Sequence, residues 1–256
     1  MQVSNTGSVS NAKNTPFDKY RKSGSYHWAV LSHNPFARNL IHLGRYQVTQ
    51  SLLESAVYGV AGKSVLDMGC GDGVLSYRIT RAGGIVSGID LCEYAIEYAK
   101  KQAILRRVHI DFSIQDVCAT KFPDGTFDAV VSNEVIEHLS EPGKMLLEIK
   151  RVLRPGGIAV LSTPIRVTKK PLDPYHVNEW FREDFCDLVE LVFPDVEYRV
   201  SQSNSAYRRM VSHEIGEKGI ADYLSFLESD VLRIFHGAIS STVRDSTEFT
   251  ILMRRT

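Results

Sequence analysis

The chain has 256 residues, of which 43% are hydrophobic and 23% charged, as in an ordinary soluble globular protein. Thirty Lys and Arg balance thirty Asp and Glu, so no overall field directs the chain toward nucleic acid or an anionic membrane. The four cysteines form no C-x-x-C pair, which argues against a disulfide framework or a zinc knuckle. Neither a signal peptide nor a membrane-spanning run is recognisable. We therefore expect a cytoplasmic protein with no membrane partner.

The N-terminal quarter divides into two parts. Residues 1–15 are rich in Ser, Asn, Thr and Gly and are predicted to form a flexible tail. Residues 16–60 are amphipathic and predict a helical cap; the apolar positions at helical spacing are Leu40, Leu43, Val48, Leu52 and Leu53. Aromatic side chains at Tyr20, Tyr26 and Trp28 either anchor this cap or form a lid over a bound ligand.

The middle of the chain alternates between strand-like and helix-like patterns of apolar residues. Short apolar runs at residues 64–66, 85–89, 108–112, 129–132 and 158–162 are separated by helical stretches. Such alternation predicts a mostly parallel sheet with crossover helices, hence a doubly wound α/β core over residues 61–202.

The C-terminal part is predicted to complete the same domain, which spans residues 16–256. A helix is expected over residues 180–193 and strands over 196–200 and 248–253. Between these strands, residues 203–246 form an insert with a helical pattern around 223–235. An insert beside a ligand-binding edge usually shapes the substrate site. Residues 247–256 contain the last strand.

A glycine-rich turn follows the first predicted strand. Asp67 precedes Gly69, Gly71 and Gly73 in the pattern D-x-G-x-G-x-G. Glycines allow the backbone to approach a ligand closely, at the sheet edge where ligands of such folds bind. The dinucleotide fingerprint is G-x-G-x-x-G, and a carboxylate at position 67 would repel a pyrophosphate. The turn therefore favours a cationic, amino-acid-like ligand over NAD.

An acidic residue ends the second predicted strand. Asp90 lies 17 residues after Gly73, near the separation at which a carboxylate accepts the two ribose hydroxyls of a nucleoside. A lone Asp at a strand end is more often a helix cap. Coupled to the glycine turn, it favours nucleoside binding.

Two further motifs follow, Q-D-V at residues 115–117 and F-D-A-V-V-S-N at residues 127–133. Together with the glycine turn and Asp90, they resemble successive motifs of the class I, Rossmann-like S-adenosylmethionine-dependent methyltransferases over about residues 63–164. The resemblance implies a seven-stranded, mostly parallel sheet with an antiparallel last strand, and S-adenosylmethionine as cofactor. Within that family the glycine turn holds the methionine moiety, the second-strand acid the ribose and the third-strand Asp the adenine. The implied cofactor-binding residues are Asp67, Gly69, Cys70, Gly71, Asp90, Leu91, Asp116, Val117 and Asn133.

An E-x-x-E-H run follows directly. If a helix begins here, Glu134, Glu137 and His138 are spaced i, i+3, i+4 and share one face. Two carboxylates and an imidazole converging at the end of the fourth strand can bind a divalent metal or transfer a proton. Alternatively, Glu134 contacts the cofactor and no metal is bound.

A second histidine lies in the run H-V-N-E-W that begins at His176. Together the two runs resemble the small-RNA 3′-terminal 2′-O-methyltransferases, which implies Mg²⁺ or Mn²⁺ held by Glu134, Glu137, His138 and His176. The second run is also similar to bacterial methyltransferases of saccharide, lipid and natural-product pathways. Without a metal, His138 or His176 is the candidate general base. The candidate catalytic residues are thus His138, His176 and Glu134.

These features predict a methyltransferase that acts on a hydroxyl of a small-molecule or saccharide-like acceptor. A metal-dependent RNA 3′-terminal 2′-O-methyltransferase is the first alternative, although neutral charge and the lack of a basic stripe count against RNA as partner. A cofactor-binding scaffold without catalysis is the second.

Overall fold

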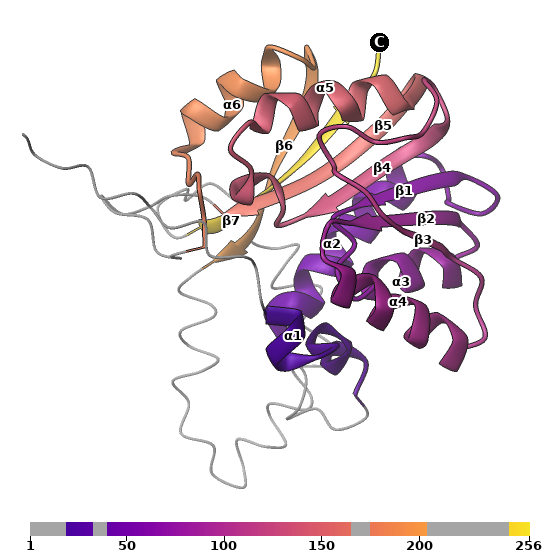
Figure 1. Ribbon diagram of the computed structural model, residues 1–256. Coiled ribbons are helices and arrows are strands. Elements are labelled where there is room, and N and C mark those ends of the chain that lie inside the picture. Colours follow the sequence, from indigo (N-terminus) through magenta and orange to yellow (C-terminus); the bar gives the residue numbers. More distant parts are fainter. Residues whose placement is uncertain (1–18, 33–39, 165–174, 204–245) are drawn as a thin grey trace, which may run out of the picture.

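A computed structural model describes residues 19–32, 40–164, 175–203 and 246–256. Its core is one seven-stranded sheet with the order β3-β2-β1-β4-β5-β7-β6 (Figure 1). The first five strands run parallel, whereas β7 is antiparallel to both β5 and β6. The strands are β1 (Ser64–Met68), β2 (Ile85–Asp90), β3 (Asp111–Ile114), β4 (Phe127–Asn133), β5 (Leu153–Pro164), β6 (Asp195–Ser203) and β7 (Ser246–Arg254). The predicted Rossmann-like fold is confirmed.

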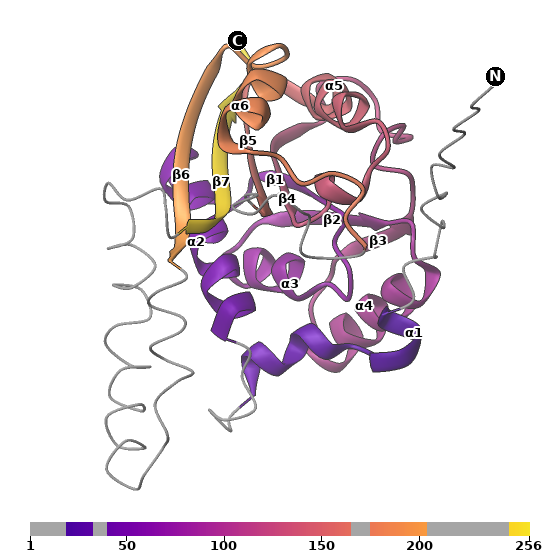
Figure 2. The ribbon, with the colours of Figure 1, turned by 90° about the vertical axis from the view of Figure 1, so that its left-hand side faces the viewer.

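Helices cover both faces of the sheet. On one face lie α2 (Leu40–Ala56), α3 (Val74–Arg81) and α4 (Glu93–Leu105), and on the other lie α5 (Pro142–Val152) and α6 (Arg182–Glu190) (Figures 1 and 2). The short α1 (Lys19–Ser23) and the 3₁₀ helix η1 (Tyr26–Leu31) precede α2. A second 3₁₀ turn, η3 (Ile136–His138), follows β4. None of the helices within the described ranges is long and apolar enough to cross a membrane.

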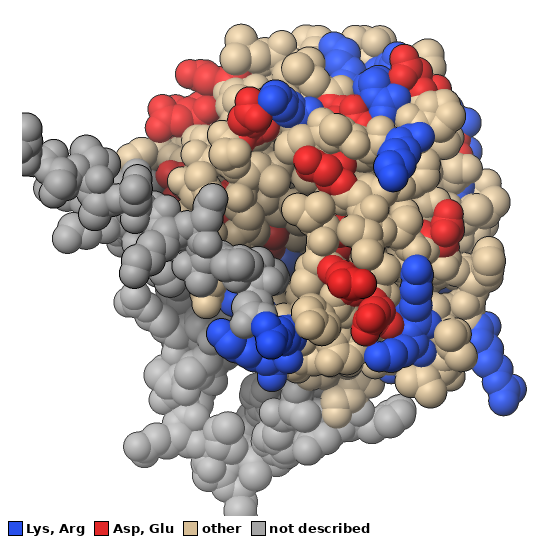
Figure 3. Space-filling model, in the orientation of Figure 1, with Lys and Arg blue, Asp and Glu red and all other residues tan. Residues whose placement is uncertain are grey.

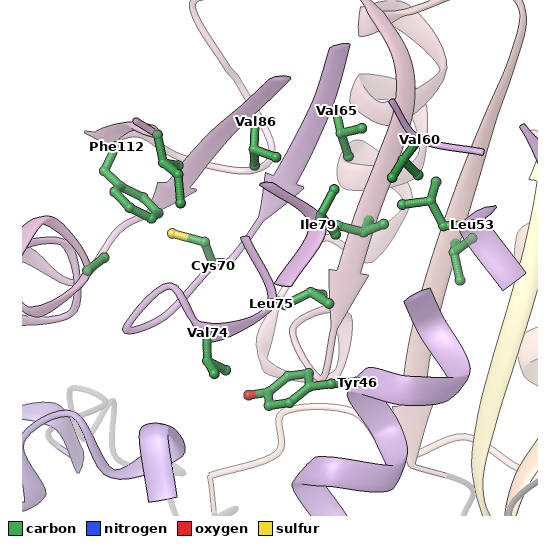
Figure 4. Close-up of a cluster of buried hydrophobic side chains, with 14 of the residues drawn as sticks. Tyr46, Leu53, Val60, Val65, Cys70, Val74, Leu75, Ile79, Val86 and Phe112 are labelled. Atoms are coloured by element: carbon green, nitrogen blue, oxygen red, sulfur yellow. The ribbon is translucent and has the colours of Figure 1, made fainter. Parts of the chain in front are cut away.

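Two hydrophobic cores form because successive strand residues point to opposite faces of a sheet. Val65 and Val131 belong to the core under α2, α3 and α4. Their neighbours Leu66 and Val130 belong to the core under α5 and α6. Figure 4 shows the first core, where Tyr46 of α2 packs near α3 and the strands. Parallel strands buried on both faces explain the continuous apolar runs in the sequence.

The third strand begins later than the sequence pattern predicts. The apolar residues 108–112 indicate a strand there, but β3 is Asp111–Ile114. Arg107 adopts a left-handed φ of +53°, and the backbone N–H of Val108 donates to the carbonyl of Ala103 at 3.1 Å. Residues 106–108 therefore form the turn that ends α4, and Ile110 is buried without belonging to the strand.

The N-terminal helices are fixed to the core through Trp28. Its indole Nε1 donates to the backbone carbonyl of Asp72 at 2.7 Å, and the Arg106 guanidinium lies 3.8 Å from the centre of the ring. This aromatic residue anchors the segment, one of the two roles expected for the aromatic cluster. The predicted tail (1–15) and most of the predicted insert (203–246), with its helical pattern at 223–235, lie outside the described residues.

Candidate active site

The glycine turn between β1 and α3 requires glycine for conformational reasons. Gly69, Gly71 and Gly73 have φ values of +74°, +53° and +83°, in the left-handed region that other residues rarely adopt. The backbone N–H groups of Gly69 and Cys70 both donate to the carbonyl of Ile89 at 2.8 Å. The turn is thereby held against the end of β2.

Asp90 at the end of β2 completes this arrangement. Its carboxylate accepts the backbone N–H of Gly71 at 2.9 Å and that of Cys92 at 2.8 Å. Burial raises the pKa of this carboxyl, while the two N–H donors oppose the increase. The residue predicted to bind ribose therefore also fixes the glycine turn.

Asp67 is more buried than expected for a residue that contacts a bound ligand. Its side chain is buried and accepts the hydroxyl of Ser76 in α3 at 2.5 Å. Burial raises the pKa of Asp67 to about 7. Asp67 thus contacts the helix that follows the turn, and it stabilises the glycine turn by linking β1 to α3.

The other predicted cofactor residues lie at the carboxyl ends of β1, β2 and β3. Cys70 and Val117 are buried, whereas Leu91 is 71% exposed. Asp116 accepts the backbone N–H of Cys118 at 2.8 Å. These residues come together along the edge of the sheet where parallel α/β folds bind ligands.

Asp72 was not recognised from the sequence, where it occupies a variable position of the glycine motif. It is fully buried, accepts the backbone N–H of His27 at 3.0 Å, and lies 3.3 Å from His27 Nδ1. A methyl group on Gly71 would collide with the Tyr20 hydroxyl. The N-terminal segment therefore lies directly on the glycine turn.

A second group of polar side chains surrounds the segment after β4. Glu137 is fully buried; its Oε2 accepts the Thr163 hydroxyl at 3.2 Å, whereas Oε1 has no hydrogen-bond partner within the described residues. Burial raises the pKa of Glu137 well above its usual value, and the nearby charge of Glu134 adds to the increase. His138 Nε2 lies 4.0 Å from Oε1 of Glu137.

His176 joins this group because backbone contacts fix its neighbours. The N–H groups of Val177 and Asn178 both donate to the Glu137 carbonyl at 2.9 Å, and the Asn178 side chain donates to the Leu139 carbonyl at 2.6 Å. Ligand atoms of Glu137, His138 and His176 lie within 4.8 Å of one another. We call these three residues the Glu-His-His cluster.

The Nδ1 atoms of both histidines face oxygen atoms. His138 Nδ1 is 3.0 Å from the carbonyl of Tyr175, and His176 Nδ1 is 2.7 Å from a carboxylate oxygen of Glu179. A carbonyl only accepts hydrogen bonds, so Nδ1 of His138 carries the proton. The same tautomer suits His176. In both rings Nε2 then holds the lone pair needed to bind a metal or accept a proton.

Glu134, the fourth predicted metal ligand, has other partners. Its carboxylate lies 2.9 Å from the Arg45 guanidinium of α2 and accepts the Ser162 hydroxyl at 3.1 Å. Glu134 has a φ of +55°, and only a single 3₁₀ turn follows at residues 136–138. The helix on which the i, i+3, i+4 spacing depends is therefore not formed, because β4 ends at Asn133 and α5 begins at Pro142.

Helix α2 also contacts the last residue of β4. The Thr49 hydroxyl donates to Oδ1 of Asn133 at 2.9 Å. The Asn133 Nδ2 atom is buried and has no hydrogen-bond partner in the part of the chain that the structure describes. An amide donor is thus buried at the end of β4, beside Glu134.

Comparison with known proteins identifies the family of the segment that carries the glycine turn, Asp90 and Asp116. We call the sheet edge formed by these residues the cofactor edge. Residues 66–161 match the family model described as "Methyltransferase domain". This segment is a class I S-adenosylmethionine-dependent methyltransferase domain. The methyltransferase domain covers the glycine turn, the acidic residues of the cofactor edge and the E-x-x-E-H run. The recognition of a methyltransferase, made from motifs alone, is confirmed.

Curated relatives of the methyltransferase domain include two proteins named "Ubiquinone biosynthesis O-methyltransferase". The protein from Pasteurella multocida is 33% identical over 129 residues, which cover 46% of this chain and 53% of that protein. The protein from Psychrobacter cryohalolentis is 36% identical over 163 residues, 60% of this chain and 61% of its own. The matched region thus spans about half the length of these relatives.

Solved structures show the same fold. A Haemonchus contortus phosphoethanolamine N-methyltransferase 2, solved with phosphomonomethylethanolamine and S-adenosylhomocysteine, superposes with a TM-score of 0.63 at 18% sequence identity. The match covers 92% of this chain and 58% of that one. At this identity the similarity establishes the fold of the methyltransferase domain.

Three residues that contact the site carried no recognisable sequence signal. Asp72 stands between two glycines, and Arg45 and Thr49 look like ordinary polar positions of an amphipathic helix. Glu179 lies in the H-V-N-E-W run, three residues after His176, and that spacing is the signal that could have assigned it.

Proposed function

We propose that the chain transfers the methyl group of S-adenosylmethionine to a hydroxyl oxygen of a small-molecule or saccharide-like acceptor. The observation that carries this proposal is the Glu-His-His cluster at the end of β4, in which a fully buried carboxylate lies beside two imidazoles. An oxygen nucleophile must lose its proton during methyl transfer, and these are groups that accept or displace a proton. The names of the two curated relatives, both O-methyltransferases, point in the same direction.

S-adenosylmethionine supplies a methyl group bonded to a positively charged sulfur. The residues of this chain position the reactants, which is the main source of acceleration in an in-line displacement. A lone pair of the acceptor oxygen forms the new C–O bond, while the electrons of the C–S bond remain on the sulfur. The glycine turn and Asp90 would bind the nucleoside and amino-acid ends.

The proton of the acceptor hydroxyl requires a base. His176 is suited to this role because Glu179 accepts from its Nδ1 at 2.7 Å, so the imidazolium formed after proton transfer is stabilised by a buried carboxylate. The Nδ1 atom of His138 faces a neutral carbonyl instead of a carboxylate, and the Glu137 carboxylate lies farther away, 4.0 Å from its Nε2. Glu134 is already paired with Arg45. We therefore assign His176 as the general base in a metal-free reaction.

The same residues also fit a divalent cation. Glu137 offers a buried carboxylate oxygen without a hydrogen-bond partner among the described residues, and each imidazole has its Nδ1 directed to an oxygen, as metal-binding histidines do. We propose Glu137, His138 and His176 as ligands, with Glu134 as a fourth only if it leaves Arg45. The mixed imidazole and carboxylate donors favour Mn²⁺ over Mg²⁺. A bound cation lowers the pKa of an acceptor hydroxyl.

A small acceptor is favoured over RNA by the charge distribution. Figure 3 shows basic and acidic side chains interspersed on one face, without a continuous basic stripe among the coloured residues. RNA binding depends on neutralising backbone phosphates with Lys and Arg. An absence of RNA binding at low salt, measured with a single-stranded oligonucleotide, is the result we expect.

The proposal is tested in two steps with the whole chain. Calorimetry should detect binding of S-adenosylmethionine and S-adenosylhomocysteine, and Asp90→Ala should weaken it by about tenfold or more, as expected for lost charge-assisted hydrogen bonds. Methyl-labelled cofactor is then offered with a panel of monosaccharides and catechols. A labelled methyl ether supports the proposal. Cofactor binding without transfer to any hydroxyl compound favours the scaffold alternative.

Chelation tests whether methyl transfer requires a metal. If the cation version holds, extensive treatment with a chelator abolishes transfer and Mn²⁺ restores it, while Glu137→Gln weakens Mn²⁺ binding. If transfer survives chelation and is lost in His176→Ala, the metal-free version holds.

A further inference from the structure

The two ends of the Asn133 side-chain amide have different surroundings. Its Oδ1 accepts the Thr49 hydroxyl at 2.9 Å, and its Nδ2 is buried with no hydrogen-bond partner among the described residues. A buried donor without a partner loses its hydrogen bonds to water and gains none in return. Such a group is expected to gain its partner from a ligand.

Asn133 lies close in the fold to the residues that hold the Glu-His-His cluster. It is the last residue of β4 and pairs in register with Ser162 of β5. The next residue, Glu134, accepts the Ser162 hydroxyl, and Thr163 donates to Glu137 of the Glu-His-His cluster. The amide therefore lies between helix α2 and strand β5, and the next residue of β5, Thr163, contacts the Glu-His-His cluster through Glu137.

Thr49 determines which end of the amide faces the site. Asn Oδ1 accepts hydrogen bonds and Nδ2 donates them. Because Thr49 donates to Oδ1, the amide is fixed with its donor end away from α2. Without the Thr49 hydroxyl, a 180° rotation about the last side-chain bond would place the oxygen there instead.

We infer that Asn133, positioned by Thr49, selects a hydroxyl rather than an amine as methyl acceptor. This inference rests on the proposed function. A hydroxyl oxygen has two lone pairs. One forms the C–O bond while the C–S electrons move to sulfur, and the other accepts the Asn133 N–H as the oxygen's proton passes to the base. A neutral amine has a single lone pair, which the reaction consumes. Its remaining N–H groups would then face the N–H donor of Asn133, with no acceptor between them.

The test uses 2-aminophenol, which carries a hydroxyl and an amine on adjacent carbons, with methyl-labelled S-adenosylmethionine. The wild-type chain should form mainly the O-methyl product. Asn133→Asp replaces the donor by an acceptor and should shift the O-to-N product ratio toward nitrogen by about tenfold, the effect of one hydrogen bond. Thr49→Val should shift it in the same direction, and Thr49→Ser should restore the wild-type ratio.

Thr80→Val is the matched control, because the Thr80 hydroxyl donates to the Ser76 carbonyl within α3. Mainly N-methyl product from the wild type would overturn the inference. An unchanged product ratio in both Asn133→Asp and Thr49→Val would also overturn it; if Asn133→Asp is inactive, Thr49→Val decides. No product from the wild type with 2-aminophenol or with any hydroxyl compound of the panel, with S-adenosylhomocysteine binding intact, would instead contradict the proposed function and the inference with it.

Discussion

The Arg45 guanidinium lies 2.9 Å from the Glu134 carboxylate, so helix α2 reaches the residue that follows β4. Both side chains are mostly buried, with 16% and 17% of their surface exposed. Burial raises the pKa of Glu134, and Arg45 opposes this increase most strongly. The ion pair therefore favours the charged form of a carboxylate beside the Glu-His-His cluster.

Removing one partner of this pair should be costly. Arg45→Met leaves an uncompensated buried carboxylate, which we expect to lower the free energy of unfolding by about 3 kcal/mol. The double variant with Glu134→Gln should recover much of this loss, because no buried charge remains. Urea denaturation measures both. Lys101→Met, which breaks an exposed pair with Glu97, should change stability by less than about 0.5 kcal/mol. Equal losses in the single and double variants would refute this account.

Stability should fall with rising pH because of Asp67. Its pKa is about 7 in the folded chain, compared with about 3.9 when unfolded. Between these values the folded state holds a proton that the unfolded state has released. This group therefore lowers the free energy of unfolding by about 1.4 kcal/mol per pH unit across that range, and has no further effect above about pH 7.

Asp67→Asn isolates this contribution, because asparagine cannot titrate but its oxygen can accept the Ser76 hydroxyl. The free energies of unfolding of the wild type and Asp67→Asn should be compared by urea denaturation from pH 5 to pH 8. The wild type should lose stability relative to the variant up to about pH 7. A difference that does not vary with pH would show that Asp67 keeps an ordinary pKa.

Glu179 should control the metal affinity of His176, if the cation version holds. Glu179→Gln leaves the volume unchanged but replaces the carboxylate that fixes the imidazole, and loss of such a partner typically weakens metal binding by about 10- to 100-fold. Isothermal calorimetry with Mn²⁺ measures the effect. Glu183→Gln, on the exposed start of α6, is the control and should bind as the wild type does. Equal Mn²⁺ affinity in both variants would show that Glu179 does not influence metal binding.

Gly71 should not tolerate a side chain. Gly71→Ala forces a left-handed φ on alanine, which costs about 1–2 kcal/mol, and its methyl group meets the Tyr20 hydroxyl. We expect lower stability and weaker S-adenosylhomocysteine binding, measured by denaturation and calorimetry. Gly143→Ala in α5, where nothing lies within 4 Å of the new methyl group, should instead raise stability by up to about 1 kcal/mol. Wild-type cofactor affinity in Gly71→Ala would disprove the close approach.

The cofactor edge could be predicted because its information is local. The apolar strands alternate with helices, and the glycine turn must follow the first strand, so spacing predicted the places of Asp67, Gly71 and Asp90. Their roles toward the cofactor came from the family resemblance and stay predictions. The approach of His176 to Glu137 and His138 was also expected, although only from the resemblance of the two runs. Its physical basis, the two N–H donors on the Glu137 carbonyl, is not visible in the sequence.

The contribution of α2 could not be predicted, because it depends on how a helix packs on strand ends more than 80 residues away. Arg45 and Thr49 have the character of surface residues in a helical pattern. The spacing argument for Glu134 failed for a related reason: it assumed an α-helix, whereas the left-handed backbone at Glu134 and a single 3₁₀ turn redirect its side chain.

The paired N–H donors of Val177 and Asn178 on the Glu137 carbonyl have a consequence for evolution and design. They hold His176 by its neighbours on the C-terminal side. The side chain at position 176 can therefore be exchanged without losing the two backbone contacts beside it, which makes this position a practical one at which to alter the reaction chemistry.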